Sequence, residues 1–280
     1  MSVKRLRQSL HELATSINDC DEKKITFDQL IARACKYMTH GRKEYGTLAI
    51  GSLSVEEVQQ CLKIKPTKND LELQQDIQPL PMGISFDHVL SSTQKAFAMS
   101  NESGMRLILN ILLTNAHDLV SSLPAPGRKL RFGTEGAWSY GPVTLKREGE
   151  RERKYMLSGR PDYHLWYGSQ ADTAVNVVVV EAKRPGLAGL GVGQALAYMS
   201  IVHNIRKRDK KKDIKVFGLA SDGVVWHFLK INEKSEWSEK LIAIRDREYK
   251  EVLGVLVHFL HQAAVMSPGH SQQSSGQADE

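Results

Sequence analysis

The stretch that decides the fold is Val177-Val178-Val179-Val180-Glu181-Ala182-Lys183, an unbroken apolar run that ends in a carboxylate and an amine. A fully apolar, β-branched run is typical of a strand that is covered on both faces. Because side chains alternate along a strand, Glu181 and Lys183 point to the same face, opposite Ala182. The sequence therefore predicts two charged groups at the edge of a buried core.

A second predicted strand precedes this one and brings another carboxylate. The segment Gly159-Arg160-Pro161-Asp162-Tyr163 opens a strand over residues 163–167. The polar connection over residues 168–176 is short enough for the two strands to pair antiparallel. We therefore expect Asp162 to lie beside the charged pair at the end of the apolar strand.

Two carboxylates and a lysine are the composition of a magnesium site with a positioned water. Hard oxygen ligands hold the ion, which keeps several waters and lowers the pKa of one of them. The amine orients or deprotonates the nucleophile. This composition favours hydrolysis of a phosphodiester bond.

With Pro161-Asp162 and Glu181-Ala182-Lys183 as its two halves, the chain resembles the PD-(D/E)xK nuclease superfamily. Downstream, Gln194-Ala195-Leu196-Ala197-Tyr198 looks like the Gln-x-x-x-Tyr element that RecB-like members carry on the helix after the catalytic strand. Glutamine and tyrosine at this spacing share a helix face. The residues of these motifs, together with Ser221-Asp222-Gly223, look most like those of the nuclease-like domains that are widespread in fungi.

The resemblance covers roughly residues 86–265. It implies an α/β (α+β) fold with a restriction-endonuclease-like core, in which helices flank a mixed central sheet. It also implies a metal-dependent nuclease that uses Mg²⁺ or Mn²⁺, with nucleic acid as the partner and DNA favoured over RNA.

The resemblance also implies roles for particular residues. Family members often carry a further acidic ligand on the first core helix, and Glu102 is the residue that matches it. Lys183 would activate a water together with the metal, while Gln194 and Tyr198 would orient the scissile strand. The implied metal ligands are Glu102, Asp162, Glu181 and the carbonyl of Ala182.

Each of these residues also has a structural interpretation. Glu181 and Lys183 would form an ion pair at a strand end, and Asp162 would cap a turn. Glu102 would be favoured by the positive end of its helix. A nuclease fold kept as a nucleic-acid-binding or protein-interaction module is therefore the alternative to an enzyme.

A glycine-rich segment between the apolar strand and the Gln194 helix admits a second interpretation, a dinucleotide-binding turn. The spacing does not fit, because the sixth position of the fingerprint is Gln194 when counted from Gly189 and Leu196 when counted from Gly191. We interpret these glycines instead as residues that let a flexible loop approach a backbone or a phosphate.

The net charge of +6 and the pI of about 9.1 have the sign that a phosphate backbone favours. The basic run Arg206-Lys207-Arg208 ends the Gln194 helix. It would bind nucleic acid, act as a nuclear import signal, or complement the helix C-terminus as a solvated segment. Arg160 and Arg184 are adjacent to the predicted ligands, so they are the stronger candidates for phosphate contact.

Composition excludes several other classes. With 280 residues, 41% of them hydrophobic and 25% charged, the chain can bury one ample core or a core plus a small helical unit. It has no apolar run long enough for a membrane span and no apolar signal core at its N-terminus, so we expect an intracellular protein, in the nucleus or cytoplasm. Cys20, Cys35 and Cys61 lack metal-knuckle spacing, and we expect reduced core thiols.

Four regions are predicted along the chain. Helical spacing over residues 3–18 and 26–40, followed by a capping box that starts at Ser54, predicts an N-terminal helical unit, a candidate surface for a protein partner. The regions are this unit over 1–65, a linker or strap over 66–85, the nuclease-like domain over 86–265, and a disordered tail over 266–280. Within the domain, we expect two helices to about residue 120, strands near 130–146, 155–167, 175–183, 215–220 and 224–231, the Gln194 helix to about 208, and a last helix over 246–264.

Overall fold

The protein is described from a computed structural model. The structure describes residues 14–15, 17, 26, 28–31, 45–124, 130–166, 176–245 and 248–265. Helical backbone at 14–15, 17 and 28–31 falls within the two helices predicted near the N-terminus. The remainder of those helices, with Cys20, Cys35 and the tail over 266–280, lies outside the described residues. Two compact units, Met1–Gly46 and Thr47–Glu280, make up the chain, and the predicted site belongs to the second.

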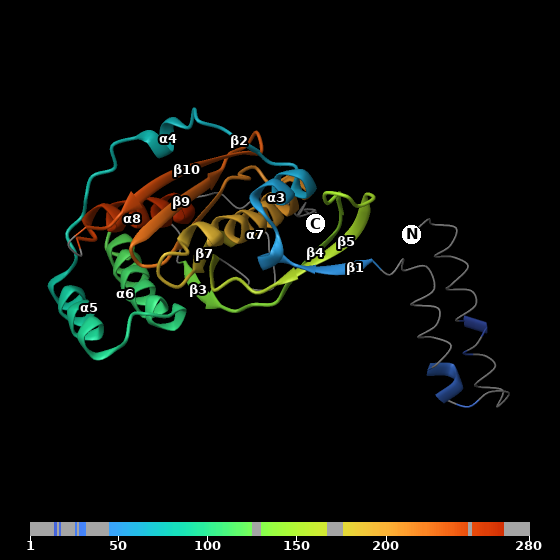
Figure 1. The fold of residues 1–280 in the computed structure, drawn as a ribbon, viewed down its shortest axis with the longest axis horizontal. Helices are drawn as coiled ribbons and strands as arrows, with labels where there is room; N and C mark the ends of the chain where they lie inside the picture. Colours follow the sequence, from blue (N-terminus) through green and yellow to red (C-terminus); the bar gives the residue numbers. More distant parts are fainter. Residues whose placement is uncertain are drawn as a thin grey trace, which may run out of the picture. The chain divides into compact units, whose positions relative to one another are not determined.

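A seven-stranded mixed sheet forms the centre of this second unit (Figure 1). The pairs β7–β8 and β10–β2 are parallel, and the other neighbours are antiparallel. The mixed α/β class expected from the sequence is therefore confirmed. In spatial order the strands are β2 (Lys65–Pro66), β10 (Glu236–Ala243), β9 (Val225–Ile231), β8 (Val216–Ser221), β7 (Asn176–Ala182), β6 (Tyr163–Trp166) and β3 (Arg131–Thr134).

Alternating side chains divide the core between the two faces of this sheet. Phe217 and Leu219 of β8 belong to one apolar cluster, with α6 (Glu102–Ser121) and α8 (Lys250–Val265). Val216 and Ala220 belong to a second cluster, with α7 (Ala188–Arg208) and α3 (Val55–Leu62). The helix α5 (Ile84–Ala96) packs beside α6. This alternation is the period of two that a strand covered on both faces requires.

Helix α7 is buried nearly all round in its middle, from Gly191 to His203. One side contacts β7 and β8, and α3 contacts another side. A helix that is apolar on every side is expected only where it is enclosed in this way. The short helix η1 (Ile50–Ser52) also packs against it, so the segment before residue 65 completes the core around α7.

This packing shifts the expected division of the chain. The third N-terminal helix forms as predicted, with the Ser54–Glu57 capping box present. It belongs with the larger unit, however, because the division falls at Gly46–Thr47 instead of near residue 65. Cys61 of this helix is a buried free thiol, and burial raises its pKa to about 11.

Two segments predicted as single strands are each split between two sheets. Residues 130–146 form β3 and β4 (Trp138–Leu145), and residues 155–167 form β5 (Arg153–Gly159) and β6. The strands β4 and β5 pair in a separate three-stranded sheet with β1 (Gly46–Ala49). The chain leaves one sheet for the other at Glu135, which has a positive φ of 53°, and at Pro161, which has no N–H to donate. The Glu135 N–H donates to the Pro161 carbonyl (3.1 Å), which joins the two crossings.

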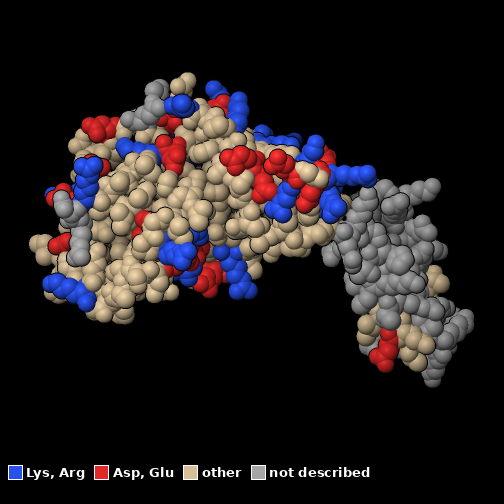
Figure 2. All heavy atoms as spheres, in the orientation of Figure 1, with Lys and Arg blue, Asp and Glu red and all other residues tan. Residues whose placement is uncertain are grey.

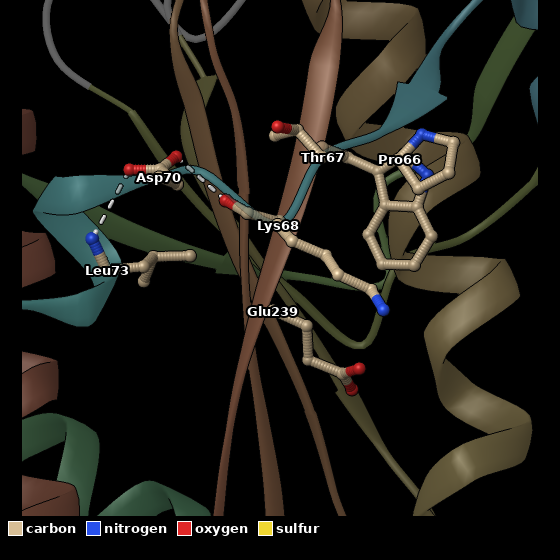
Figure 3. A pocket seen from close by; sticks show the side chains of 8 residues that line it. Pro66, Thr67, Lys68, Asp70, Leu73 and Glu239 are labelled. Atoms are coloured by element: carbon tan, nitrogen blue, oxygen red, sulfur yellow. Dashed lines mark hydrogen bonds between the residues drawn. The ribbon is translucent and has the colours of Figure 1, made fainter.

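A strand that the sequence interpretation missed, β10, holds the strap over 66–85 in place. Asp70 accepts hydrogen bonds from Ser238 Oγ (2.8 Å) and Lys230 Nζ (3.0 Å) and caps α4 (Leu71–Gln74) through the N–H groups of Glu72 and Leu73. Figure 3 shows Asp70 turned toward the Leu73 N–H inside a pocket of about 380 Å³. Because its carboxylate is occupied by these bonds, Asp70 anchors the strap structurally.

Charged side chains of both signs lie on the surface shown in Figure 2, and they are interspersed where α3 and the β4–β5 pair lie. None of the helices in the described ranges is long and apolar enough to cross a membrane.

The glycines before Gln194 lie inside α7, which corrects the expectation of a flexible loop there. A Cβ at Gly191 would lie 2.9 Å from Ala220 Cβ and 3.2 Å from Lys183 Cγ, and a Cβ at Gly193 would lie 2.9 Å from the Leu53 carbonyl. These glycines let the start of α7 approach β8 and the segment before α3. Gly186, with φ of +79°, belongs to the turn that precedes the helix.

Substituting two glycines of α7 tests this packing. We expect Gly191→Ala to lower the free energy of unfolding by about 1–3 kcal/mol, because the helix must move off β8. A Cβ at Gly189 meets no described atom within 4 Å, so Gly189→Ala should raise stability by about 0.5–1 kcal/mol. Urea denaturation of both variants measures this, and equal effects of the two substitutions would contradict the packing described.

Candidate functional site

The two predicted carboxylates lie at the ends of neighbouring strands. The strands β6 and β7 pair antiparallel with Tyr163 opposite Val180, and the next step of this register sets Asp162 opposite Glu181. The Ala182 N–H donates to Asp162 Oδ2 at 2.7 Å, which ties the start of one strand to the end of the other. The structure therefore brings together the two halves of the motif that the sequence singled out.

Glu181 is the most unusual group in this site. Its side chain is 0% exposed, and neither carboxylate oxygen accepts a hydrogen bond from a described residue. Burial raises its pKa to about 8, with a further contribution from the charge of Asp162. A carboxylate without hydrogen bonds is costly in a core, so its presence indicates a functional role more than a structural one.

Lys183 links the carboxylates to α7. Its Nζ lies 3.5 Å from Glu181 Oε2 and donates to Gln194 Oε1 at 3.1 Å. The helix η1 covers Gln194, since a Cβ at Gly51 would lie 3.3 Å from its Oε1. Glu181, Lys183 and Gln194, which the sequence singled out, therefore form a chain of contacts, and the role of Gln194 in orienting a scissile strand stays a prediction.

Tyr198 takes a different place from the one expected. It is 1% exposed, its ring packs edge-on against Trp138 (centroids 5.5 Å apart), and a Cβ at Gly159 would lie 2.3 Å from its hydroxyl. Burial raises its pKa, and the charge of Glu181 raises it further. Tyr198 therefore lies beneath the site and cannot orient a scissile strand by direct contact in this structure; it supports the backbone that carries Asp162.

Arg106 is the site residue that the sequence interpretation missed. Its Nη2 contacts Asp162 Oδ1 and lies 3.0 Å from Glu102 Oε1, and its Nη1 lies 3.2 Å from Glu135 Oε1. Burial raises the pKa of Asp162, while the Ala182 N–H and the Arg106 charge oppose this rise. The spacing of Glu102 and Arg106, four residues apart on one helix, is the signal that would have found it.

Glu102 reaches the carboxylate pair only through Arg106. It is the first residue of α6, whose N-cap is Asn101. Within the described ranges, no three His, Cys, Asp or Glu side chains are arranged so that they could hold a metal ion. The predicted third carboxylate ligand is therefore not assembled here, because an arginine stands between Glu102 and Asp162.

The remaining donor set still fits a hard divalent cation. Mg²⁺ is commonly bound through one or two carboxylates, with waters and substrate phosphates filling the other positions. Asp162 and Glu181 supply such a pair, and the oxygens of Glu181 lack hydrogen-bond partners among the described residues. Ala182 is buried, and its N–H donates to Asp162 Oδ2.

Asp222 holds the loop that follows Lys183. The sequence had indicated only that Asp222 lies in a turn. Its Oδ2 accepts from the Gly186 N–H at 2.7 Å, and its Oδ1 accepts from the N–H groups of Val224 and Val225. The Lys183 N–H also donates to the Ser221 carbonyl (2.8 Å). The β8–β9 turn therefore fixes the loop that carries Arg184.

The arginines expected to contact phosphate fall into two groups. Arg160 and Arg184 are exposed and adjacent in the chain to Asp162 and Lys183, and their contact with phosphate stays a prediction. Arg206 is 1% exposed and donates to the Lys215 carbonyl (2.6 Å), which removes it as a nucleic-acid ligand. Lys207 donates to Ser235 Oγ and Arg208 pairs with Asp209, about 20 Å along α7 from Gln194.

Comparison with known proteins adds no family to this description. No family model matches the chain, and no curated protein matches it.

The burial of the Glu181 carboxylate predicts that removing it stabilises the protein. At a pH above its folded pKa of about 8, Glu181→Met should raise the free energy of unfolding by roughly 1–3 kcal/mol, because a buried charge disappears. Asp162→Ala should lower it by a similar amount, because the Ala182 N–H and Arg106 lose a partner.

The stability gained by Glu181→Met should depend on pH in a definite direction. A carboxyl whose folded pKa is raised from 4.5 to about 8 costs stability progressively as the pH rises between those values. The gain from Glu181→Met should therefore shrink toward pH 4.5. Urea denaturation at several pH values measures it, and a Glu181→Met variant as destabilised as Asp162→Ala would contradict this description.

Proposed function

We propose that the protein is a metal-dependent nuclease with a restriction-endonuclease-like core, which hydrolyses phosphodiester bonds of nucleic acid, with DNA favoured over RNA. The single observation that carries this proposal is the fully buried carboxylate of Glu181, which accepts no hydrogen bond from the described residues and lies opposite Asp162 and 3.5 Å from the amine of Lys183. The order of elements also supports it: helix α6, the antiparallel strands β6 and β7, helix α7, and β8 parallel to β7.

Each residue of the site has its own part in this chemistry. Asp162, Glu181 and the carbonyl of Ala182 would hold Mg²⁺ or Mn²⁺, which supplies charge neutralisation at a phosphate and a lower pKa for a water. Lys183 holds its ammonium between Glu181 and Gln194, where it can orient the attacking water and stabilise charge that develops on the phosphate oxygens. Gln194 fixes Lys183, and Arg160 and Arg184 bind neighbouring phosphates.

Arg106 gives the acidic pair a counter-charge when no metal is bound. Two carboxylates side by side repel each other, and the guanidinium on Asp162 and Glu102 reduces that cost. Asp162 would have to give up its contact with this arginine in order to hold a metal. Glu102, which shares the same guanidinium, would then be available as a third acidic ligand.

The same arginine favours one alternative. A module that binds nucleic acid without cutting it would keep Arg106 on Asp162 permanently, with Arg160 and Arg184 on the phosphates. Such a module would bind oligonucleotides in a salt-dependent way and release no product with either metal.

The nuclease proposal predicts cleavage of DNA by the purified full-length chain with Mg²⁺ or Mn²⁺. Asp162→Ala and Lys183→Ala should each reduce the rate by about 100-fold or more, since each removes a group at the reacting phosphate. Lys65→Ala is the matched control, because Lys65 is exposed on β2 at the opposite edge of the sheet. Intact DNA and RNA after incubation with both metals would rule out the enzyme.

If Arg106 acts as a counter-charge to Asp162, Arg106→Ala should strengthen the binding of a metal ion. Without the guanidinium, Asp162 should bind Mn²⁺ more tightly, by about tenfold or roughly 1.4 kcal/mol. Calorimetric titration with Mn²⁺ measures this without depending on cleavage. Weaker or unchanged Mn²⁺ binding would show that Arg106 does not compete for the metal ligand.

A further inference from the structure

An apolar pocket of about 500 Å³ lies beside the loop that follows Lys183. Pro185 of that loop lines one side, and Gly223 and Val224 of the β8–β9 turn line another. The Gly186 N–H to Asp222 bond joins these two sides. Pro185 is two residues from Lys183, a span of at most about 7 Å, so the pocket is within reach of a nucleotide next to one held at the site.

The other walls come from helices and carry large, soft side chains. Phe97 follows α5 and is 57% exposed, and Met99 and Met105 flank the start of α6. Tyr249 closes the pocket before α8, and its ring packs edge-on against Trp226. Aromatic rings and thioethers are the surfaces on which flat, polarisable groups stack.

The apolar lining also includes polar groups of Gln94, Tyr249 and Gly223, which form two long contacts with one another. Gln94 Nε2 lies 3.4 Å from the Tyr249 hydroxyl, and that hydroxyl lies 3.4 Å from the Gly223 carbonyl. Both distances are at the long limit for hydrogen bonds. A ligand that is flat, apolar on its faces and polar at its edges would therefore find both stacking surfaces and hydrogen-bonding groups here.

We propose that this pocket binds a nucleobase turned out of the stack, on the nucleotide next to the scissile phosphate. A volume of about 500 Å³ is within the usual range for a small-ligand site, and Arg184, which precedes Pro185, is placed for the adjoining phosphate. The inference rests on the proposed function and narrows it, because a duplex must unpair before a base can enter. The preferred substrate is therefore single-stranded or locally unpaired nucleic acid.

The test separates bases from phosphates. In a Lys183→Ala background, which should slow cutting by about 100-fold or more, fluorescence anisotropy without added metal compares binding of an oligothymidylate, an abasic strand of the same length and a duplex. The single strand should bind about tenfold more tightly than the abasic strand, the scale expected for stacking of one base. Phe97→Ala should remove that difference without weakening binding of the abasic strand.

Leu241→Ala is the matched control, because Leu241 is equally exposed (58%) but lies on β10 and does not line the pocket. It should leave all three affinities unchanged, and Phe97→Ala should keep the wild-type melting temperature. Equal binding of oligothymidylate and abasic strand, or a Phe97→Ala variant that binds both as wild type does, overturns the pocket but leaves the nuclease proposal intact. Failure of the Lys183→Ala protein with Phe97 intact to bind any strand counts against the proposed function itself, and the pocket proposal falls with it.

Discussion

The hydrogen bond from the Ala182 N–H to Asp162 Oδ2 is the constraint on which the site depends. It fixes the beginning of β6 against the end of β7, and with it the placement of Asp162 opposite Glu181. The hydrogen bond from the Glu135 N–H to the Pro161 carbonyl holds the residue before Asp162 in place. Tyr198 fills the space next to Gly159. A carboxylate that accepts a backbone N–H is oriented by the fold itself, so the acidic pair is preorganised before any ligand arrives.

Charge balance then explains the rest of the site. Glu181 is held where its charge is poorly compensated, and the elevated pKa of about 8 reflects that cost. Lys183 offsets part of it at 3.5 Å, and Arg106 offsets the charge of Asp162 from α6. The stabilisation needed to keep such groups inside comes from the two apolar clusters on either face of the sheet. A divalent cation would relieve the same repulsion more completely, which links the stability of the fold to its proposed chemistry.

The sequence predicted those parts of the fold that local patterns specify. Alternation and turn chemistry found β8 and β9 around Asp222-Gly223, and the apolar run followed by a helix found β7 and α7. The break at Glu135 was missed, because a strand that changes sheets looks continuous when only its residues are considered. The start of β6 at Tyr163, by contrast, was predicted from the residues that precede it. Arg106 was missed because its role depends on Asp162, 56 residues away in the chain. Glycines of α7 were misjudged because their purpose, close approach to β8 and to the segment before α3, is a tertiary contact.

The most direct test of the proposed metal site is where Mn²⁺ binds. Anomalous X-ray scattering from crystals of the full-length protein grown with MnCl₂ locates the ion without relying on activity. We expect one site coordinated by Asp162 and Glu181, with the Arg106 guanidinium moved away from Asp162. An ion bound elsewhere, or crystals in which Arg106 still contacts Asp162 and no manganese lies between the carboxylates, would contradict the metal site.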